Sequence, residues 1–125
     1  MVNRSRDRGE GLARSLGCEF IPLGDISAAS GELLIQTTPV GMWPHVDQCP
    51  VPERILKQGM VVMDIVYHPS ETRLLRMARA RGCITISGTR MLIHQGAEQF
   101  RLWTGMEPPL SIMNMAIEEA LLREK

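Results

Sequence analysis

GTRMLIHQGAEQFRLWTG, residues 88–105, is the most strongly patterned stretch of this 125-residue sequence. Gly88 can adopt backbone conformations closed to other residues, Thr89 can cap a following helix, and Gly105 can end one. Together these signals predict a helix over residues 90–104. The stretch therefore joins the end of a strand to a long helix.

This predicted helix has two different faces. Ile93, Ala97 and Phe100 fall at positions i, i+4 and i+7 and form one apolar stripe. Met91 and Gln95 lie four residues apart on another face. We expect the stripe to pack against the protein and the other face to meet a ligand.

Outward from this helix, short apolar strands alternate with helices. The clearest strand is the continuous, β-branched run at residues 61–67, between Gly59 and Pro69. The alternation predicts an α/β fold whose mostly parallel, twisted sheet carries helices on both faces. Other strands are expected at residues 18–23, 33–37 and 83–87, after a strand that ends near residue 4, and other helices at residues 7–17, 52–56, 71–81 and 110–121.

Apolar stripes predict which helix faces are buried. The first helix carries Leu12, Ala13 and Leu16, and Gly17 ends it. The two remaining stripes comprise Leu74, Leu75, Met77 and Ala78 in one helix and Leu110, Met113, Ile117, Ala120 and Leu121 in the last.

Composition and charge limit the class of protein. The chain is 44% hydrophobic and 22% charged, with 14 basic and 14 acidic residues, so no global field attracts nucleic acid or an anionic membrane. Cys18, Cys49 and Cys83 are widely spaced and odd in number, which favours reduced, structural thiols in the cytoplasm. The start reads as the end of a strand, so a fragment is expected. Its exposed sheet edge leaves a homo-oligomer open.

Four predicted strand ends run into unusual loops, at residues 3–8, 38–42, 67–69 and 88–91. In parallel α/β sheets such loops line one edge, where ligands bind. In the first loop Arg4, Arg6 and Arg8 surround the hydroxyl of Ser5, a set suited to an adenosine 2′-phosphate. A solvated basic helix start explains the same composition about as well.

The stretch 88–105, together with DIVYHPSETRLLRMARARG and TTPVGM, resembles the C-terminal part of shikimate dehydrogenases. The resemblance covers nearly the whole chain. It implies a partial Rossmann-like, NADP-binding domain at residues 1–105, lacking its first strand and Gly-rich loop, and a C-terminal helix at 106–125. It also implies NADPH-dependent reduction of 3-dehydroshikimate to shikimate in aromatic amino-acid biosynthesis.

The resemblance assigns roles residue by residue. Ser5 stands where Thr is usual, and Gln36 and His68 each stand where Asn is usual; Gln36 is one methylene longer. The implied substrate-binding residues are Tyr67 and Gln95. The implied cofactor-binding residues are Asn3, Arg4, Ser5, Arg8, Thr38, Met42, Val66, Gly88 and Met91.

The resemblance also implies that catalysis needs a Lys–Asp pair on a separate N-terminal substrate domain, which nothing here resembles. His68 forms no triad or metal spacing with His45 or His94, so neither a catalytic residue nor a metal site is expected. We predict that the chain alone binds NADP weakly and does not turn over shikimate. Two alternatives remain: a quinate or NAD-dependent relative, and a non-catalytic dinucleotide-binding or interaction module.

Overall fold

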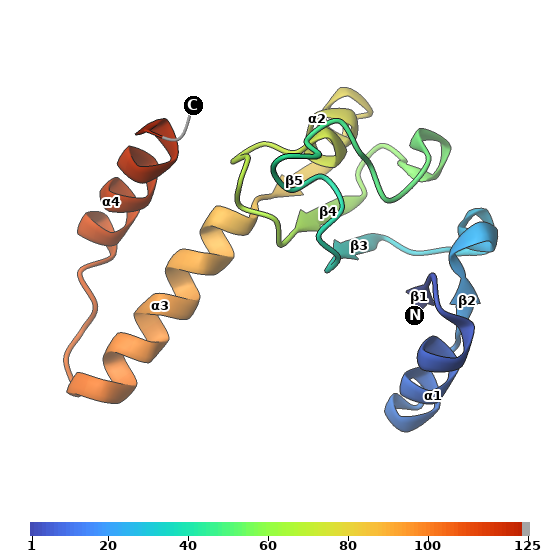
Figure 1. The fold of residues 1–125 in the computed structure, drawn as a ribbon, viewed down its shortest axis with the longest axis horizontal. Helices are drawn as coiled ribbons and strands as arrows, with labels where there is room; N and C mark the ends of the chain where they lie inside the picture. The colour runs from blue at the N-terminus through green and yellow to red at the C-terminus, as the bar shows by residue number, and fades with distance from the viewer. Residues whose placement is uncertain (124–125) are drawn as a thin grey trace.

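The computed structural model describes residues 1–123 (Figure 1). Within them, none of the helices combines the length and apolar character needed to cross a membrane. Residues 124 and 125 of the predicted C-terminal helix lie outside the described part. In chain order the elements are β1 (Val2–Asn3), α1 (Arg6–Leu16), β2 (Ile21–Pro22), the 3-10 helix η1 (Leu23–Ala28), β3 (Leu33–Gln36), the 3-10 helix η2 (Glu53–Ile55), β4 (Val61–Asp64), α2 (Arg73–Ala80), β5 (Ile84–Ile86), α3 (Gly88–Thr104) and α4 (Leu110–Arg123).

All the strand pairs in the described part are parallel, which confirms the predicted α/β class. They form two sheets rather than the single sheet expected: β1 pairs with β2, and β4 lies between β3 and β5. Figure 1 shows β1 beside β3 but not joined to it. The strands are also shorter than predicted. β4 ends at Asp64 instead of residue 67, and β2 keeps only two residues of the run 18–23.

The core lies where α2 covers β4. Leu74, Leu75 and Ala78 of α2 are at most 2% exposed and contact Val62 of β4, which is fully buried. Burying each large aliphatic side chain contributes roughly 1.5–3 kcal/mol. The predicted stripe of α2 is thereby confirmed, and this contact holds the C-terminal end of β4 in place.

The stripe predicted for α1 is confirmed for Ala13 and wrong for the two leucines. Leu12 and Leu16 are 50% and 64% exposed, whereas Gly9 and Ala13 are buried. The reason is a close contact: a methyl group at Gly9 would lie 2.2 Å from a ring carbon of Phe20. The helix therefore turns Gly9 and Ala13 inward, an orientation that hydrophobicity alone does not reveal.

A substitution pair on α1 tests this contact. Gly9→Ala would place its methyl 2.9 Å from Asn3 Cβ as well as against Phe20, so we expect it to lower the free energy of unfolding by about 1–3 kcal/mol. Gly11→Ala is the matched control, because nothing lies within 4 Å of its added methyl. It should raise stability by about 0.5–1 kcal/mol through helix propensity alone. Urea unfolding measures both, and equal effects would contradict the packing.

α3 begins at Gly88, two residues earlier than predicted, with Ser87 as its N-cap. The predicted Thr89 cap is wrong, because the buried Thr89 Oγ1 has no hydrogen-bond partner in the described part. Ile93 and Ala97 are buried as expected, and the left-handed Gly105 (φ 68°) ends the helix. The predicted apolar face of α4 is only partly buried, since Leu110 is 43% exposed and Ala120 is exposed.

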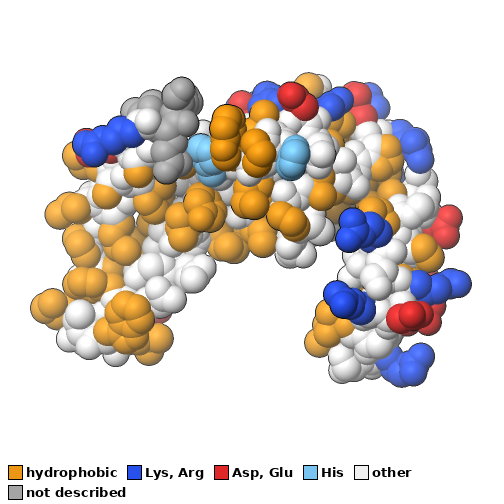
Figure 2. All heavy atoms as spheres, in the orientation of Figure 1, with side chains coloured by type: hydrophobic (Ala, Val, Ile, Leu, Met, Phe, Trp, Pro, Cys, Tyr) orange, Lys and Arg blue, Asp and Glu red, His pale blue; other side chains and the backbone are white. Residues whose placement is uncertain are grey.

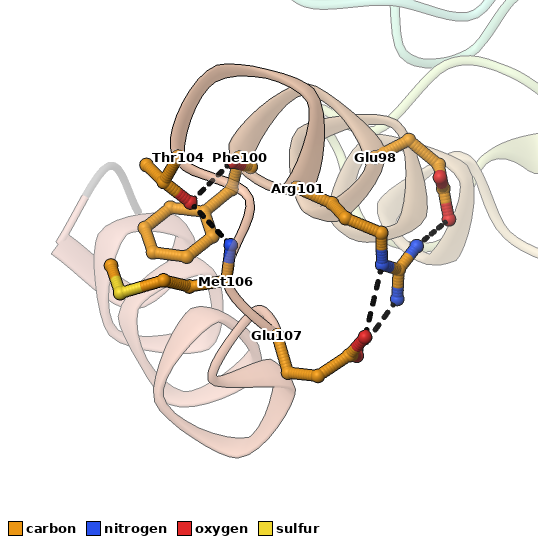
Figure 3. A network of polar contacts seen from close by, with 6 residues as sticks. All are labelled: Glu98, Phe100, Arg101, Thr104, Met106 and Glu107. Carbon is orange, nitrogen blue, oxygen red and sulfur yellow. Dashed lines mark hydrogen bonds and ion pairs between the residues drawn. The ribbon is translucent and has the colours of Figure 1, made fainter.

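A polar cluster secures the turn between α3 and α4 (Figure 3). Arg101 bridges Glu98 at 2.5 Å and Glu107 at 3.0 Å. Its guanidinium lowers the pKa of Glu107. Thr104 Oγ1 donates to the Phe100 carbonyl at 2.7 Å and accepts from the Met106 N–H at 3.1 Å. These contacts order the start of the turn between the two helices, which together are here termed the α3–α4 hairpin.

The hairpin carries much exposed apolar surface. Figure 2 shows the molecule as an arch, with α1 in one limb and hydrophobic side chains spread over the α3–α4 hairpin in the other. Leu102 and Trp103 are each 81% exposed, and Met106, Ile112 and Met115 exceed half exposure. Large exposed apolar patches are typical of surfaces that contact another protein, a ligand or a membrane.

Candidate functional site

The ends of β3 and β4 bring two loops together. The strands pair in the register that sets Gln36 beside Asp64, so their following loops leave from one edge. Between these loops lies a pocket of about 550 Å³, here termed the strand-end pocket. Its residues are Thr37, Thr38, Pro39, Met42, Trp43, Ile65, Val66, Tyr67 and His68. Of the four loops predicted to line one edge, those at residues 38–42 and 67–69 therefore meet in this pocket, with Thr38, Met42, Val66 and Tyr67 among its lining.

Gly88 joins this region from the side of α3. A methyl group at Gly88 would lie 2.3 Å from the Ile65 carbonyl oxygen and 2.5 Å from that of Val66. The position needs glycine because backbone presses on backbone, and not because of the special dihedral angles expected from sequence; the positive-φ glycines lie elsewhere. The start of α3 thus rests against the loop that follows β4.

The arginine loop lies apart from the strand-end pocket, at the end of β1 in the other sheet. Asn3 Oδ1 accepts from the Ser5 N–H at 2.9 Å and so orders the loop. Arg6 pairs with Glu10 along α1 at 3.0 Å. Arg4 and Arg8 are exposed and form no ion pair within residues 1–123. Their two guanidinium groups are therefore the ones available to an anion.

Met91 and Gln95 occupy α3 one turn apart. Met91 is partly buried and Gln95 is exposed. Neither is among the described residues that line the strand-end pocket. The structure therefore brings together the loops after β3 and β4 and Gly88. Met91, Gln95 and the arginine loop lie outside the strand-end pocket.

Sequence reasoning missed Trp43. Its ring lies edge-on to the His68 ring, with centroids 6.0 Å apart, and its backbone N–H donates to the His68 carbonyl at 3.0 Å. The contact joins the loop after β3 to the loop after β4 at the edge of the pocket. A tryptophan directly after TTPVGM was the available signal.

Asp64 was also missed, although a carboxylate inside the apolar run VVMDIV was a visible anomaly. It is fully buried, and it accepts hydrogen bonds from Thr72 Oγ1 at 2.6 Å and the Val66 N–H at 3.0 Å. Gln36 donates to it at 3.3 Å, so the longer side chain found in place of Asn is hydrogen-bonded. Burial raises the pKa of Asp64, while the bonds from Thr72 and Val66 lower it.

The raised pKa of Asp64 predicts a pH dependence. The folded state favours the protonated acid, so this contribution to stability is complete below the unfolded value of about 3.9 and is lost as pH rises through the folded pKa. Asp64→Asn cannot titrate. We therefore expect the stability of the wild type relative to the variant to fall as pH rises above about 4, with a slope of at most about 1.4 kcal/mol per pH unit.

Urea unfolding at each pH measures this difference. Burial raises the pKa of the nearby Cys49 thiol, and Asp64 raises it further, so that group titrates only at alkaline pH. Asp25→Asn removes an exposed carboxylate on η1 and serves as the control. A pH-independent difference for Asp64→Asn would contradict the prediction.

Comparison with known proteins gives the site its context. Residues 88–118 match the family described as the Shikimate 5'-dehydrogenase C-terminal domain. Shikimate dehydrogenase (NADP(+)) of Methanosarcina mazei is 47% identical over 97% of this chain. The chain resembles the C-terminal half of shikimate dehydrogenases. It spans 46% of the length of that relative, and the resemblance predicted from the sequence is confirmed.

Solved structures agree with this comparison. Shikimate 5-dehydrogenase of Thermus thermophilus, in complex with NADP(H) and shikimate, has a TM-score of 0.86 and 38% identity, covering 96% of this chain and 45% of that one. Quinate dehydrogenase of Corynebacterium glutamicum, in complex with NAD, has a TM-score of 0.83 and 33% identity, covering 94% and 45%. The partial Rossmann-like fold is therefore shared by shikimate dehydrogenases and a quinate dehydrogenase.

Proposed function

We propose that this chain is the cofactor-binding half of an NADP-dependent shikimate dehydrogenase, a cytoplasmic enzyme of aromatic amino-acid biosynthesis. The observation that best supports this proposal is the strand-end pocket, where Thr38, Met42, Val66 and Tyr67 lie together beyond the ends of parallel strands. Dinucleotides bind at this edge of open α/β sheets. The mostly apolar walls fit the nicotinamide end of such a cofactor, which would supply or accept the hydride.

The adenosine end of NADP would lie at the arginine loop. Arg4 and Arg8 offer guanidinium forks that match phosphate oxygens, and Ser5 adds a hydroxyl. Asn3 orders the same loop through its bond to the Ser5 N–H. The 2′-phosphate, which NADP has and NAD lacks, would accept hydrogen bonds from both arginines.

The remaining residues would hold the nicotinamide and the substrate. The Val66 carbonyl and the backbone at Gly88 would meet the carboxamide, and Met42 and Met91 would shield the ring. Tyr67, 47% exposed, and the exposed Gln95 would present hydroxyl and amide groups to 3-dehydroshikimate. The proton for the developing alkoxide would come from a Lys–Asp pair on the substrate domain.

The proposal includes one further strand. β1 and β3 each pair on one side only in the described part, and both line a pocket of about 460 Å³. Met1 and Val2 face it from one side, and Leu33, Leu34 and Ile35 from the other. A parallel strand placed there would join the two sheets, and the Gly-rich phosphate loop would follow it. Residues 1–105 would then be a partial NADP-binding domain.

The α3–α4 hairpin would contact the substrate domain. Leu102, Trp103, Ile112 and Met115 present apolar surface that a second domain would cover. The hairpin follows directly from Gly88, so this contact would place the substrate domain beside the strand-end pocket. Self-association through the same surface would be seen as a homo-oligomer.

Two other functions remain as candidates. A relative using quinate or NAD is supported by the similarity to a quinate dehydrogenase solved with NAD. The arginine loop favours NADP over NAD. A non-catalytic dinucleotide-binding or interaction module would not need the exposed Tyr67 and Gln95.

Cofactor selectivity can be measured by calorimetry on the 125-residue chain. We expect weak NADP binding, preferred over NAD, that Arg4→Ala reduces by about 10- to 100-fold because a charge-assisted hydrogen bond is lost. Arg6→Ala is the matched control, since Arg6 is engaged with Glu10. Equal losses in the two variants, or equal binding of NAD, would contradict recognition of the 2′-phosphate.

Catalysis can be tested by complementation. The chain is co-expressed with the part of the Methanosarcina mazei enzyme that precedes the matched region, and NADPH formation from shikimate is followed by absorbance. We expect activity in the mixture and none in either part alone, because hydride acceptor and proton-transfer groups would lie on different parts. Greater activity with quinate or NAD would favour the relative. A stable but inactive complex would favour the non-catalytic module.

A further inference from the structure

Three buried polar residues of the described part form one connected network. Gln36, Asp64 and Thr72 are the buried polar or charged residues, and their exposures are 5%, 0% and 1%. They come from the ends of β3 and β4 and from the N-cap of α2. All three lie beneath the loops that form the strand-end pocket.

Gln36 holds the first wall of that pocket. Its Nε2 donates to the carbonyls of Thr38 at 2.9 Å and Val40 at 3.1 Å, and its Oε1 accepts from the Thr38 N–H. One side chain therefore satisfies three backbone groups of the loop after β3. Gly41 follows in the same loop, and a methyl group there would lie 3.9 Å from Thr72 Cβ.

Asp64 holds the second wall and joins it to the first. One carboxylate oxygen accepts from both the Val66 N–H and Gln36 Nε2, at 3.0 and 3.3 Å. The other oxygen accepts from Thr72 Oγ1 at 2.6 Å. Thr72 in turn accepts from the Leu75 N–H at 3.3 Å and caps α2, whose apolar face is anchored in the core.

A buried carboxylate without a cationic partner among its contacts costs desolvation free energy, and apolar residues of similar shape would avoid that cost. Removing a single member instead leaves buried donors or acceptors unsatisfied. The network is thus poorly explained by stability alone. Its contacts connect the two pocket walls to each other and to α2.

We propose that Gln36, Asp64 and Thr72 are positioning residues that couple the two walls of the strand-end pocket and set their separation. The assignment of the nicotinamide end to this pocket rests on the proposed function, but the coupling does not. Loosening either wall withdraws a partner from Asp64 and should therefore loosen the other wall.

Amide hydrogen exchange measured by NMR tests the coupling on the 125-residue chain. We expect Thr72→Val to speed exchange of the Thr38 N–H, and Gln36→Leu to speed exchange of the Val66 N–H, each by about tenfold, through loss of a buried hydrogen bond. Thr72→Ser keeps the hydroxyl and should restore the slow exchange. The Ile84 N–H, bonded to the Met60 carbonyl in the neighbouring strand, is the internal reference.

Ile26→Val serves as a control for general destabilisation, because Ile26 lies in the core on η1 and outside the network. A positioning role requires changes across the network that this control does not reproduce. The coupling would be overturned if each substitution affected only its own loop, or if the Ile84 N–H changed equally.

Ligand binding tests the role in positioning. Thr72→Val and Gln36→Leu should weaken NADP binding about tenfold while leaving adenosine 2′,5′-bisphosphate, which lacks the nicotinamide, within about twofold. Thr72→Ser should bind NADP like the wild type. Equal weakening of both ligands, or of neither, would overturn positioning at the nicotinamide end. Failure of the wild type to bind either ligand would count against the proposed function, while amide exchange would still decide the coupling.

Discussion

The pairing of β3 with β4 is the constraint on which the candidate site depends. Parallel pairing sends both C-terminal ends to one edge, and the register sets Gln36 beside Asp64. A slip of one residue in either strand would turn that strand's side chain to the opposite face of the sheet and so separate Gln36 from Asp64. The two pocket walls, the polar network and the seat of Gly88 against Ile65 and Val66 all follow from this register.

Stability and positioning come from different layers around β4. Val62, Leu74 and Leu75 exclude water and supply the apolar burial. Asp64, further along the strand, and Thr72, the N-cap of α2, are equally buried but use their contacts for hydrogen bonds. The apolar layer holds α2 against the sheet, and the polar layer uses α2 as a fixed point for the loops. The positions of the loops at the strand ends therefore depend on the apolar packing of α2 against β4.

Each of the two outer limbs of the arch leaves part of its structure uncovered. The limb with α1 contains β1, which lines a pocket together with β3, and the α3–α4 hairpin exposes Trp103 and Met115. Unpaired strand edges and apolar helix faces gain stability when another part covers them. Both limbs would thus be stabilised further if another part covered them, whereas the β3–β4–β5 layer with α2 has its own core.

By itself, the sequence determined the elements and much of the site. The apolar period of α2, the glycine that ends α3 and the strand–helix alternation are local features, so they predicted the α/β class and the convergence of Thr38 with Tyr67. The tertiary structure decided what depends on distant partners. Phe20 turned Gly9 inward and left Leu12 outside, the β1 and β3 edges stayed apart, and Gln36 met Asp64 across 28 residues. The apolar periodicity of a segment indicates which of its side chains avoid water. Only the packing of segments that are distant in the sequence decides which side chains contact one another.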